Sequence, residues 1–229
     1  MSLEVLYEDN HLIAVNKPAG ALSQGDKTGD SPLLEEVREY IRHKYKKPGN
    51  VVVGLIHRLD RPVSGVLLLA RTSKALARMN KQFAEKETQK TYWALVEKAP
   101  PNESGPLTDY LVKDAKKNKS FVTGKENKNA KKAVLEYRLL LTLDRYFLLE
   151  VKPHTGRPHQ IRVQLANMGC IIKGDLKYGA ARSNPDGSIS LHARSLEFNY
   201  PVGEKGQVVI TADPNTSDNL WAAVLKKIK

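Results

Sequence analysis

HRLDRPVSG, the range His57–Gly65, is a short polar loop that leads directly into the apolar stretch Val66–Ala70. An apolar stretch of this length next to turn residues indicates a buried strand. The loop sets the carboxylate of Asp60 between the guanidinium groups of Arg58 and Arg61, and positive neighbours favour the ionised form of a carboxyl group. Its proline and its glycine restrict the backbone and allow close approach. An anion held in this way is either a structural ion pair or a nucleophile, and the loop alone leaves both interpretations open.

The composition predicts a globular protein with a basic surface. The chain has 229 residues, of which 41% are hydrophobic and 27% charged, as in ordinary soluble proteins with a substantial core. It contains 37 lysines and arginines against 25 aspartates and glutamates, so its formal net charge is +12 and its pI is near 9.6. Such an excess favours a polyanionic partner, and nucleic acid is the first candidate. A basic surface with no binding role is the alternative.

Cys170 is the only cysteine, which rules out a disulfide within the chain and predicts a reducing compartment. Its neighbours Met168, Ile171 and Ile172 predict a small buried side chain rather than a reactive thiol. No apolar stretch approaches the length of a membrane span, and the N-terminus lacks the basic region and apolar core of a signal peptide. We therefore expect a cytoplasmic protein that does not bind membranes.

The hydrophobic patterns predict more strands than helices. The predicted strands are Leu3–Tyr7, Leu12–Asn16, Val51–Val53, Gly65–Ala70, Thr91–Val96, Ala133–Leu140, Arg145–Val151, Leu191–Tyr200 and Val208–Ile210. The predicted helices are one from Ser31-Pro32 to before Pro48-Gly49, then Ser73–Glu87, Pro158–Met168 and Ser217–Ile228. We expect Ser31 and Ser73 to cap the first two helices. Because strands often follow one another directly, we expect an α+β fold with a central, mainly antiparallel mixed sheet and flanking helices.

One composition shift interrupts the single domain that we expect over residues 1–229. The segment 113–132 contains eight lysines against only Asp114 and Glu126. A solvated, partly mobile loop is the expected structure for such a segment. The same loop could attract phosphates without reading sequence, because phosphate contacts depend on charge.

A second informative segment is Lys90-Thr91-Tyr92-Trp93-Ala94-Leu95-Val96. Strand alternation places Tyr92 on one face with Ala94, and Trp93 on the other. The tyrosine is then either an ordinary core residue or a ring that stacks on a planar ligand such as a nucleobase. The segment alone favours the core.

A third segment, His154–Val163, begins a helix with basic residues, which is a favourable place for an anion. Arg162 falls near the buried face of that helix. A buried arginine needs a carboxylate partner, and Asp60 could supply one. A fourth segment, Lys173–Gly179, is a glycine-bracketed turn with a surplus lysine.

Five segments together resemble the RluA-type family of RNA pseudouridine synthases, in the family's order. They are Asn16-Lys17-Pro18-Ala19-Gly20, His57-Arg58-Leu59-Asp60-Arg61-Pro62-Val63-Ser64-Gly65, Lys90-Thr91-Tyr92, His154-Thr155-Gly156-Arg157-Pro158-His159-Gln160-Ile161-Arg162 and Gly174-Asp175-Leu176-Lys177-Tyr178-Gly179. The resemblance implies a pseudouridine-synthase-like fold with a catalytic cleft. It also implies a cofactor-free isomerisation of uridine within RNA, in which the N1–C1′ bond breaks, the uracil rotates, and C5 joins C1′.

The resemblance assigns roles to individual residues. Asp60 matches the catalytic aspartate, which either attacks the nucleotide or assists the departure of uracil. Tyr92 matches the tyrosine that stacks on the target base, and Arg162 the arginine that pairs with the aspartate. Arg58 matches the residue that fills the space left by the flipped uridine. Leu191 corresponds to an apolar residue that lines the base pocket.

RNA binding must also compensate for extracting the target base. Moving a stacked uridine out of folded RNA costs a few kcal/mol, and stacking on an aromatic ring returns about 1–3 kcal/mol. Contacts from cationic side chains to the RNA backbone would supply the remainder. We expect Lys17, Arg61, Arg157 and His159 to contribute to this RNA binding.

The chain departs from the family pattern at a few positions. Val63 stands where the family usually has threonine, Gln164 and Cys170 replace common histidines, and Ile171 replaces a common proline. These differences affect local packing and target preference more than catalysis. Many relatives carry an N-terminal S4-type RNA-binding module, whereas the resemblance here begins almost at the first residue. We therefore expect no such module, and target choice by the catalytic domain itself.

Two other functions were weighed. A metal-dependent phosphoesterase would use His57, Asp60, His154, His159 and His192, but no pair of these histidines has the helical spacing of a metal motif. A non-catalytic RNA-binding protein on the same scaffold would not need the three residues matched to the catalytic ones. We therefore predict a monomeric isomerase without cofactor or metal. Its partner is structured RNA, ribosomal or transfer, and we expect no obligate protein partner; the sequence does not indicate which uridine is modified.

Overall fold

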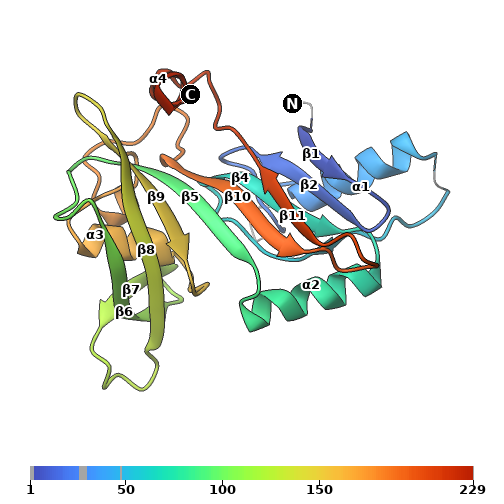
Figure 1. Cartoon of the computed structure of the whole chain (residues 1–229), viewed down its shortest axis with the longest axis horizontal. Coiled ribbons are helices and arrows are strands. Elements are labelled where there is room, and N and C mark those ends of the chain that lie inside the picture. Colours follow the sequence, from blue (N-terminus) through green and yellow to red (C-terminus); the bar gives the residue numbers. More distant parts are fainter. Residues whose placement is uncertain (1–2, 26–29, 47, 229) are drawn as a thin grey trace. The chain divides into compact units, whose positions relative to one another are not determined.

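The computed structural model describes residues 3–25, 30–46 and 48–228. The chain divides into two compact units (Figure 1). Unit 1 consists of Met1–Thr88 and Ala193–Pro214, and unit 2 of Gln89–His192 and Asn215–Lys229. The prediction of one domain over residues 1–229 is not tested by this division and stays a prediction.

Unit 1 is a sheet with two helices. Its strands are β1 (Val5–Glu8), β2 (Leu12–Lys17), β3 (Gly54–Leu55), β4 (Ser64–Ala70), β10 (Leu191–Asn199, of which the first two residues are assigned to unit 2) and β11 (Gln207–Thr211), and its helices are α1 (Leu33–Lys44) and α2 (Ser73–Glu85). The strand order is β1-β2-β4-β10, with β11 beside β10 and β3 beside β4. Leu68 of β4, Met79 of α2 and Phe198 of β10 belong to one buried cluster, so α2 covers a face of this sheet.

Unit 2 is an antiparallel sheet with strand order β5-β9-β8-β6-β7. The strands are β5 (Gln89–Val96), β6 (Ser104–Asp114), β7 (Lys119–Thr123), β8 (Lys131–Thr142) and β9 (Phe147–Pro153). The helices are α3 (Gln160–Asn167), the short 3-10 helix η1 (Leu176–Tyr178) and α4 (Asn219–Ile228). Trp93 and Trp221 form one core cluster, in which α4 packs on β5, and Leu111 and Val163 belong to another, in which α3 packs on β6.

These elements confirm the predicted α+β class, the two strands predicted at 133–140 and 145–151, which are β8 and β9, and the four helices. Three local predictions were wrong. Val51–Val53 is not a strand, since the short strand β3 follows it. The N-cap of α1 is Pro32, without a side-chain hydrogen bond, rather than Ser31. The N-cap of α2 is Thr72, whose hydroxyl accepts from the Ala75 amide, rather than Ser73.

The lysine-rich segment is also not the loop that we expected. It contains β7 and the beginning of β8, and β7 pairs with β6 from Lys119 to Thr123. The strand forms because Phe121, Val122 and Thr123 have high strand propensity and β6 offers an edge to pair with. Cys170 is buried, as predicted. Within residues 3–25, 30–46 and 48–228, no helix has the length and hydropathy needed to cross a bilayer.

Candidate active site

The Asp60 loop connects β3 to β4 in unit 1. The Lys17 side chain at the end of β2 forms hydrogen bonds to the backbone of this loop. The Lys17 side chain is fully buried. Its Nζ donates hydrogen bonds to the carbonyls of Pro18 (3.0 Å), Arg61 (3.1 Å) and Val63 (2.8 Å). Two of these acceptors, Arg61 and Val63, follow Asp60 closely in the chain. Lys17 therefore anchors the loop, a different role from the surface RNA contact that we expected.

Further hydrogen bonds join the same two sequence motifs. The Gly20 amide donates to the Arg61 carbonyl (2.8 Å), and Arg61 Nε donates back to the Gly20 carbonyl (3.0 Å). The Arg61 guanidinium also forms an ion pair with Asp30 (2.8 Å). The Leu59 amide donates to the Ser23 hydroxyl (3.2 Å), which donates to the Leu59 carbonyl (3.1 Å). The backbone on both sides of Asp60 is thus fixed by the segment that follows β2.

The electrostatics of Lys17 connect it to the predicted nucleophile. Burial lowers the pKa of Lys17 to about 7, while the negative charge of Asp60 opposes this decrease and the positive charge of Arg61 adds to it. Lys17 therefore changes charge near neutral pH. A charged ammonium has a donor for each of its three carbonyl acceptors, whereas a neutral amine has only two donors.

Gly65 and His57 fix the two ends of the loop. Gly65 has φ of +114°, and a Cβ there would lie 2.3 Å from the Ala193 carbonyl oxygen, so only glycine fits where β4 begins. The His57 Nε2 accepts a hydrogen bond from the Leu68 amide (3.0 Å), and its ring stacks on Phe83 at 5.2 Å. A histidine binds a metal through the lone pair of a ring nitrogen, and the lone pair of Nε2 already accepts a hydrogen bond from the Leu68 amide.

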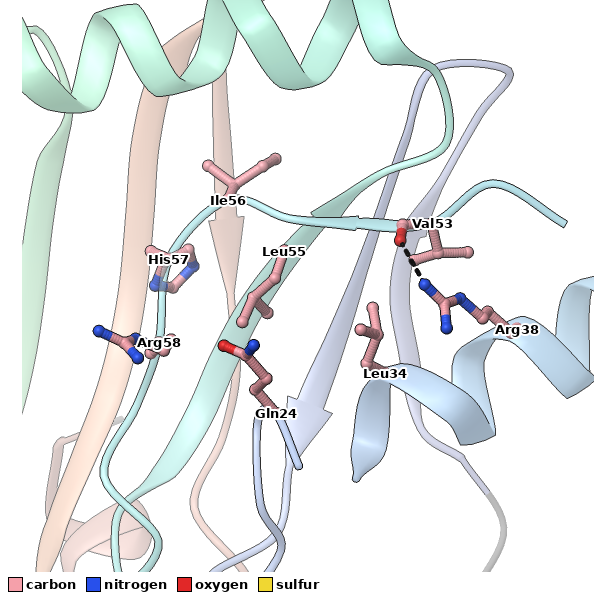
Figure 2. A pocket seen from close by; sticks show the side chains of 8 residues that line it. All are labelled: Gln24, Leu34, Arg38, Val53, Leu55, Ile56, His57 and Arg58. Atoms are coloured by element: carbon pink, nitrogen blue, oxygen red, sulfur yellow. Dashed lines mark hydrogen bonds between the residues drawn. The ribbon is translucent and has the colours of Figure 1, made fainter. Parts of the chain in front are cut away.

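A pocket of about 410 Å³ lies along the segment that leads to Asp60 (Figure 2). It is lined by Gln24, Leu34, Arg38, Val53, Leu55, Ile56, His57 and Arg58. Arg38 reaches from α1 to the Val53 carbonyl (3.4 Å), whereas Arg58 is exposed on the loop. The lining combines apolar side chains with two guanidinium groups and an amide. Guanidinium planes can stack on bases, and guanidinium and amide groups hydrogen-bond to nucleotides.

In unit 2, Arg162 lies on α3 and pairs with Asp175. Arg162 Nε and Nη2 donate to the two carboxylate oxygens of Asp175, both at 2.7 Å, and the two side chains are 6% and 1% exposed. The expectation that Arg162 has a buried carboxylate partner is therefore confirmed. This partner, Asp175, belongs to the fifth motif, to which we had assigned no role. The pairing with Asp60 stays a prediction, because Asp60 and Arg162 lie in different units.

The fourth and fifth motifs are joined at a second point. His159, which precedes α3 with φ of +55°, places its Nδ1 3.0 Å from the hydroxyl of Tyr178. The Gln160 amide oxygen accepts from the Arg157 amide (3.0 Å) and from the Thr155 hydroxyl (2.7 Å). The entry into α3 is therefore rigid. Non-glycine residues held in the left-handed region are enriched at functional sites, although they also occur in turns and helix caps, as Lys86 does at the end of α2.

The remaining predicted residues lie on strands. Tyr92 is half-buried on β5, opposite Val151 of β9, and the neighbouring Trp93 belongs to a buried core cluster. Burial lowers the pKa of Lys90, two residues before Tyr92. Leu191 is 3% exposed at the start of β10. Stacking of a base on Tyr92 stays a prediction.

No group of three or more histidine, cysteine, aspartate and glutamate side chains that could hold a metal occurs in the part of the chain that the structure describes. Two residues with informative positions were missed from the sequence. Asp175 could have been found as the single acid of a glycine-bracketed basic turn, which needs a reason to be there. Arg38 gave no signal, because its α1 position is typical of a solvated helix face.

The fold is α+β, and the loop that carries Asp60 is fixed by hydrogen bonds from the Asn16–Gly20 motif. A comparison with protein families identifies the class of protein to which this arrangement belongs. Residues 11–167 match the model of the family described as RNA pseudouridylate synthase. The match covers more than half of the chain, so the protein belongs to the RluA-type family of RNA pseudouridine synthases. The resemblance found from the five motifs is thereby confirmed.

Individual relatives are similar over most of this chain. The ribosomal large subunit pseudouridine synthase D of Borreliella burgdorferi is 35% identical, over 86% of this chain and 61% of the relative. The tRNA pseudouridine synthase C of Pectobacterium carotovorum is 35% identical, over 87% of this chain but only 56% of the relative. The tRNA pseudouridine synthase C of Vibrio cholerae is 32% identical, over 98% and 95%. The chain thus spans less than two thirds of the first two relatives.

A solved structure shares the fold. Human RNA pseudouridylate synthase domain containing 4 superimposes with a TM-score of 0.79 at 23% identity, over 98% of this chain and 92% of that one. This likeness confirms the predicted pseudouridine-synthase-like architecture.

Proposed function

We propose that this protein isomerises uridine to pseudouridine within structured RNA, with Asp60 as the catalytic residue. One observation supports the proposal most strongly. The loop that carries Asp60 is held after Asp60 by the Asn16–Gly20 motif, through the buried Lys17 and the paired hydrogen bonds between Gly20 and Arg61, and before Asp60 by the hydrogen bonds between Ser23 and Leu59. Nucleophilic and acid–base groups need such fixed geometry, because small displacements of a reacting atom cost large factors in rate.

The reaction consumes no oxidant, reductant or group donor, since atoms and electrons balance within the nucleotide. The N1–C1′ bond breaks, the uracil rotates, and a C5–C1′ bond forms; the proton on C5 is lost and N1 gains one. Asp60 either bonds transiently to the nucleotide or assists the departure of the uracil. Tyr92 stacks on the uracil, and Arg162 stabilises the negative charge of the catalytic carboxylate. Leu191 lines the space for the base.

Binding must extract the target uridine from its stack. We propose that Arg58, exposed at the edge of the Asp60 loop, occupies the place of the flipped base, and that the 410 Å³ pocket beside it takes up neighbouring RNA. Arg157 and His159 offer further polar contacts, and the net charge of +12 favours RNA generally. The relatives named for ribosomal and for transfer RNA support both classes as substrates. We further propose a monomer that acts in the cytoplasm.

Release of tritium from RNA labelled at uracil C5 tests the proposal. Wild type should release tritium, and Asp60→Asn should be at least about a thousandfold slower, a loss of about 4 kcal/mol of transition-state stabilisation. RNA affinity, measured by fluorescence anisotropy, should change by less than about threefold, since the carboxylate makes no favourable contact with phosphates. Asp144→Asn, an exposed position, is the control.

The outcomes separate the two functions. Release by Asp60→Asn at the wild-type rate would falsify the catalytic assignment. Binding without any release by wild type, on ribosomal and transfer RNA alike, would instead support a non-catalytic RNA-binding protein.

A further inference from the structure

The lysine-rich segment folds into part of a sheet, at one edge of unit 2. The strands β6, β7 and β8 lie side by side there, next to α3 (Figure 1). Eight lysines and two acidic residues fall within residues 113–132. Because these lysines project from strands and short turns, their positions follow from the strand register.

The register places two of the lysines on the face of the sheet that α3 covers. Lys113 pairs with Ser120 of β7, and Lys131 pairs with Leu111 of β6. Cross-strand partners share a face, as do residues two apart on one strand, so all four side chains project from the same face. Leu111 packs against Val163 of α3, whereas both lysines are exposed. The lysines therefore lie where the cover of α3 ends.

A pocket of about 310 Å³ opens at this margin. It is lined by Leu111, Val112, Lys113, Ser120, Asn129, Lys131, Arg157 and Pro158. Three of these side chains are cationic, and the Asn129 side-chain amide adds a group that donates hydrogen bonds to phosphate oxygens. No carboxylate lines the pocket among the residues that the structure describes.

The walls of the pocket are held in place by hydrogen bonds. The buried Ser120 donates from its hydroxyl to the Pro158 carbonyl (2.6 Å) and from its amide to the Tyr178 hydroxyl (3.0 Å). Arg157 Nε donates to the Lys132 carbonyl (3.1 Å), which fixes the orientation of the guanidinium. A guanidinium with a fixed orientation, together with two exposed lysines, suits the successive phosphates of a nucleic acid, and further lysines of the segment 113–132 add positive charge nearby in the chain.

We propose that this pocket, which we call the hairpin pocket, binds backbone phosphates of the RNA substrate. Phosphate contacts position a nucleic acid without reading its sequence. The hairpin pocket would thus select where the protein sits on a folded RNA, and leave recognition of the uridine to the Asp60 loop. The RNA as substrate rests on the proposed function, whereas phosphate binding by the pocket does not.

The salt dependence of RNA binding tests the hairpin pocket. The double variant Lys113→Gln/Lys131→Gln removes two of its cations, and Lys226→Gln/Lys227→Gln removes two exposed lysines from α4 in the same unit as a matched control. Affinity for a transcribed tRNA and a ribosomal RNA fragment is measured between about 50 and 300 mM salt. The slope of log K against log salt should fall by about 1.5 for the pocket variant, and affinity at low salt by about tenfold or more. The control should keep the wild-type slope.

Lysine acetylation of the wild-type protein gives an independent readout. Bound RNA should protect Lys113 and Lys131 but not Lys226 and Lys227. Equal slopes for the two double variants, or no protection of the pocket lysines, would overturn the proposal. The proposal would also be overturned if inorganic phosphate protected these lysines from acetylation while the salt dependence of RNA binding was the same for the pocket variant and wild type. That result would indicate a site for small anions. A changed slope without tritium release by wild type would support the hairpin pocket while contradicting the isomerase.

Discussion

The Asp60 loop and the hairpin pocket both gather positive charge, but they hold it in opposite ways. The loop is held by the fully buried Lys17 of β2, whose Nζ donates to three backbone carbonyls. The hairpin pocket contains two exposed lysines whose stems are anchored only by strand register. A buried, saturated cation fixes geometry, and an exposed one supplies charge to any anion that approaches. The first arrangement suits chemistry at one atom, and the second suits a long polyanion.

The same contrast separates two arginines of unit 2 that lie five positions apart. Arg162 is buried in a bidentate pair with Asp175, whereas Arg157 is part of a surface pocket. Removing one partner of a buried ion pair leaves the other charge without compensation, which is far more costly than losing a surface charge. Substitutions in the buried group should therefore give large losses of stability, and those in the hairpin pocket graded, salt-dependent losses of affinity.

The largest effect on stability is expected for Asp175→Asn. The substitution leaves the Arg162 guanidinium buried beside a neutral amide, and the free energy of unfolding should fall by about 3–5 kcal/mol. Both tryptophans of the chain, Trp93 and Trp221, belong to the core of unit 2, so tryptophan fluorescence in urea reports on this unit. Asp144→Asn should change the value by less than about 0.5 kcal/mol. A loss below about 1 kcal/mol for Asp175→Asn would show that the buried and exposed groups do not differ as we describe.

Lys17→Met should give an effect that reaches a comparable size at high pH, with a characteristic pH dependence. The pKa of Lys17 is about 7 in the folded protein and 10.5 for an ordinary lysine, so between these values the unfolded chain binds more protons at this position. The contribution of Lys17 to the free energy of unfolding therefore rises with pH across that window, by up to about 5 kcal/mol. Methionine does not titrate. The difference in stability between wild type and Lys17→Met should grow accordingly from about pH 7 to pH 10.

Circular dichroism in urea at several pH values measures this difference, with Lys74→Met on the exposed face of α2 as control. The control should show no trend beyond that of wild type. A Lys17 difference that is constant with pH would mean that the buried amine does not change its charge in this range.

The sequence predicted the features that depend on residues close together in the chain, and it missed those that depend on residues far apart in the chain. The apolar stretch after the Asp60 loop and the partner requirement of Arg162 are local signals, and both predictions were confirmed. Thr72 and Ser73 are adjacent residues with the same capping chemistry, so a shift by one position was beyond the pattern. The identity of Asp175 and the burial of Lys17 depend on contacts across 13 to 46 positions, which no local pattern contains.

The strand β7 was not predicted from the sequence, for a different reason. Charged residues on both sides made the segment resemble a solvated loop, although Phe121-Val122-Thr123 has strong strand propensity. Pairing with β6 decided the outcome. Local composition favoured a loop. Pairing with the edge of β6, whose position cannot be derived from the local sequence, stabilised a strand instead.

The smallest expected effects test whether the hairpin pocket is as loosely organised as we describe. Lys113→Gln and Lys131→Gln alone should each weaken RNA binding by about threefold near 0.1 M salt, and change the free energy of unfolding by less than about 0.5 kcal/mol. Because exposed lysines contact phosphates independently, the two losses in binding free energy should add within about 0.5 kcal/mol in a double-mutant cycle measured by anisotropy. The losses should also shrink together as salt rises. A coupling above about 1 kcal/mol would mean that the pocket holds one phosphate in a fixed geometry, as the Asp60 loop holds its carboxylate, and the contrast between the two regions would disappear.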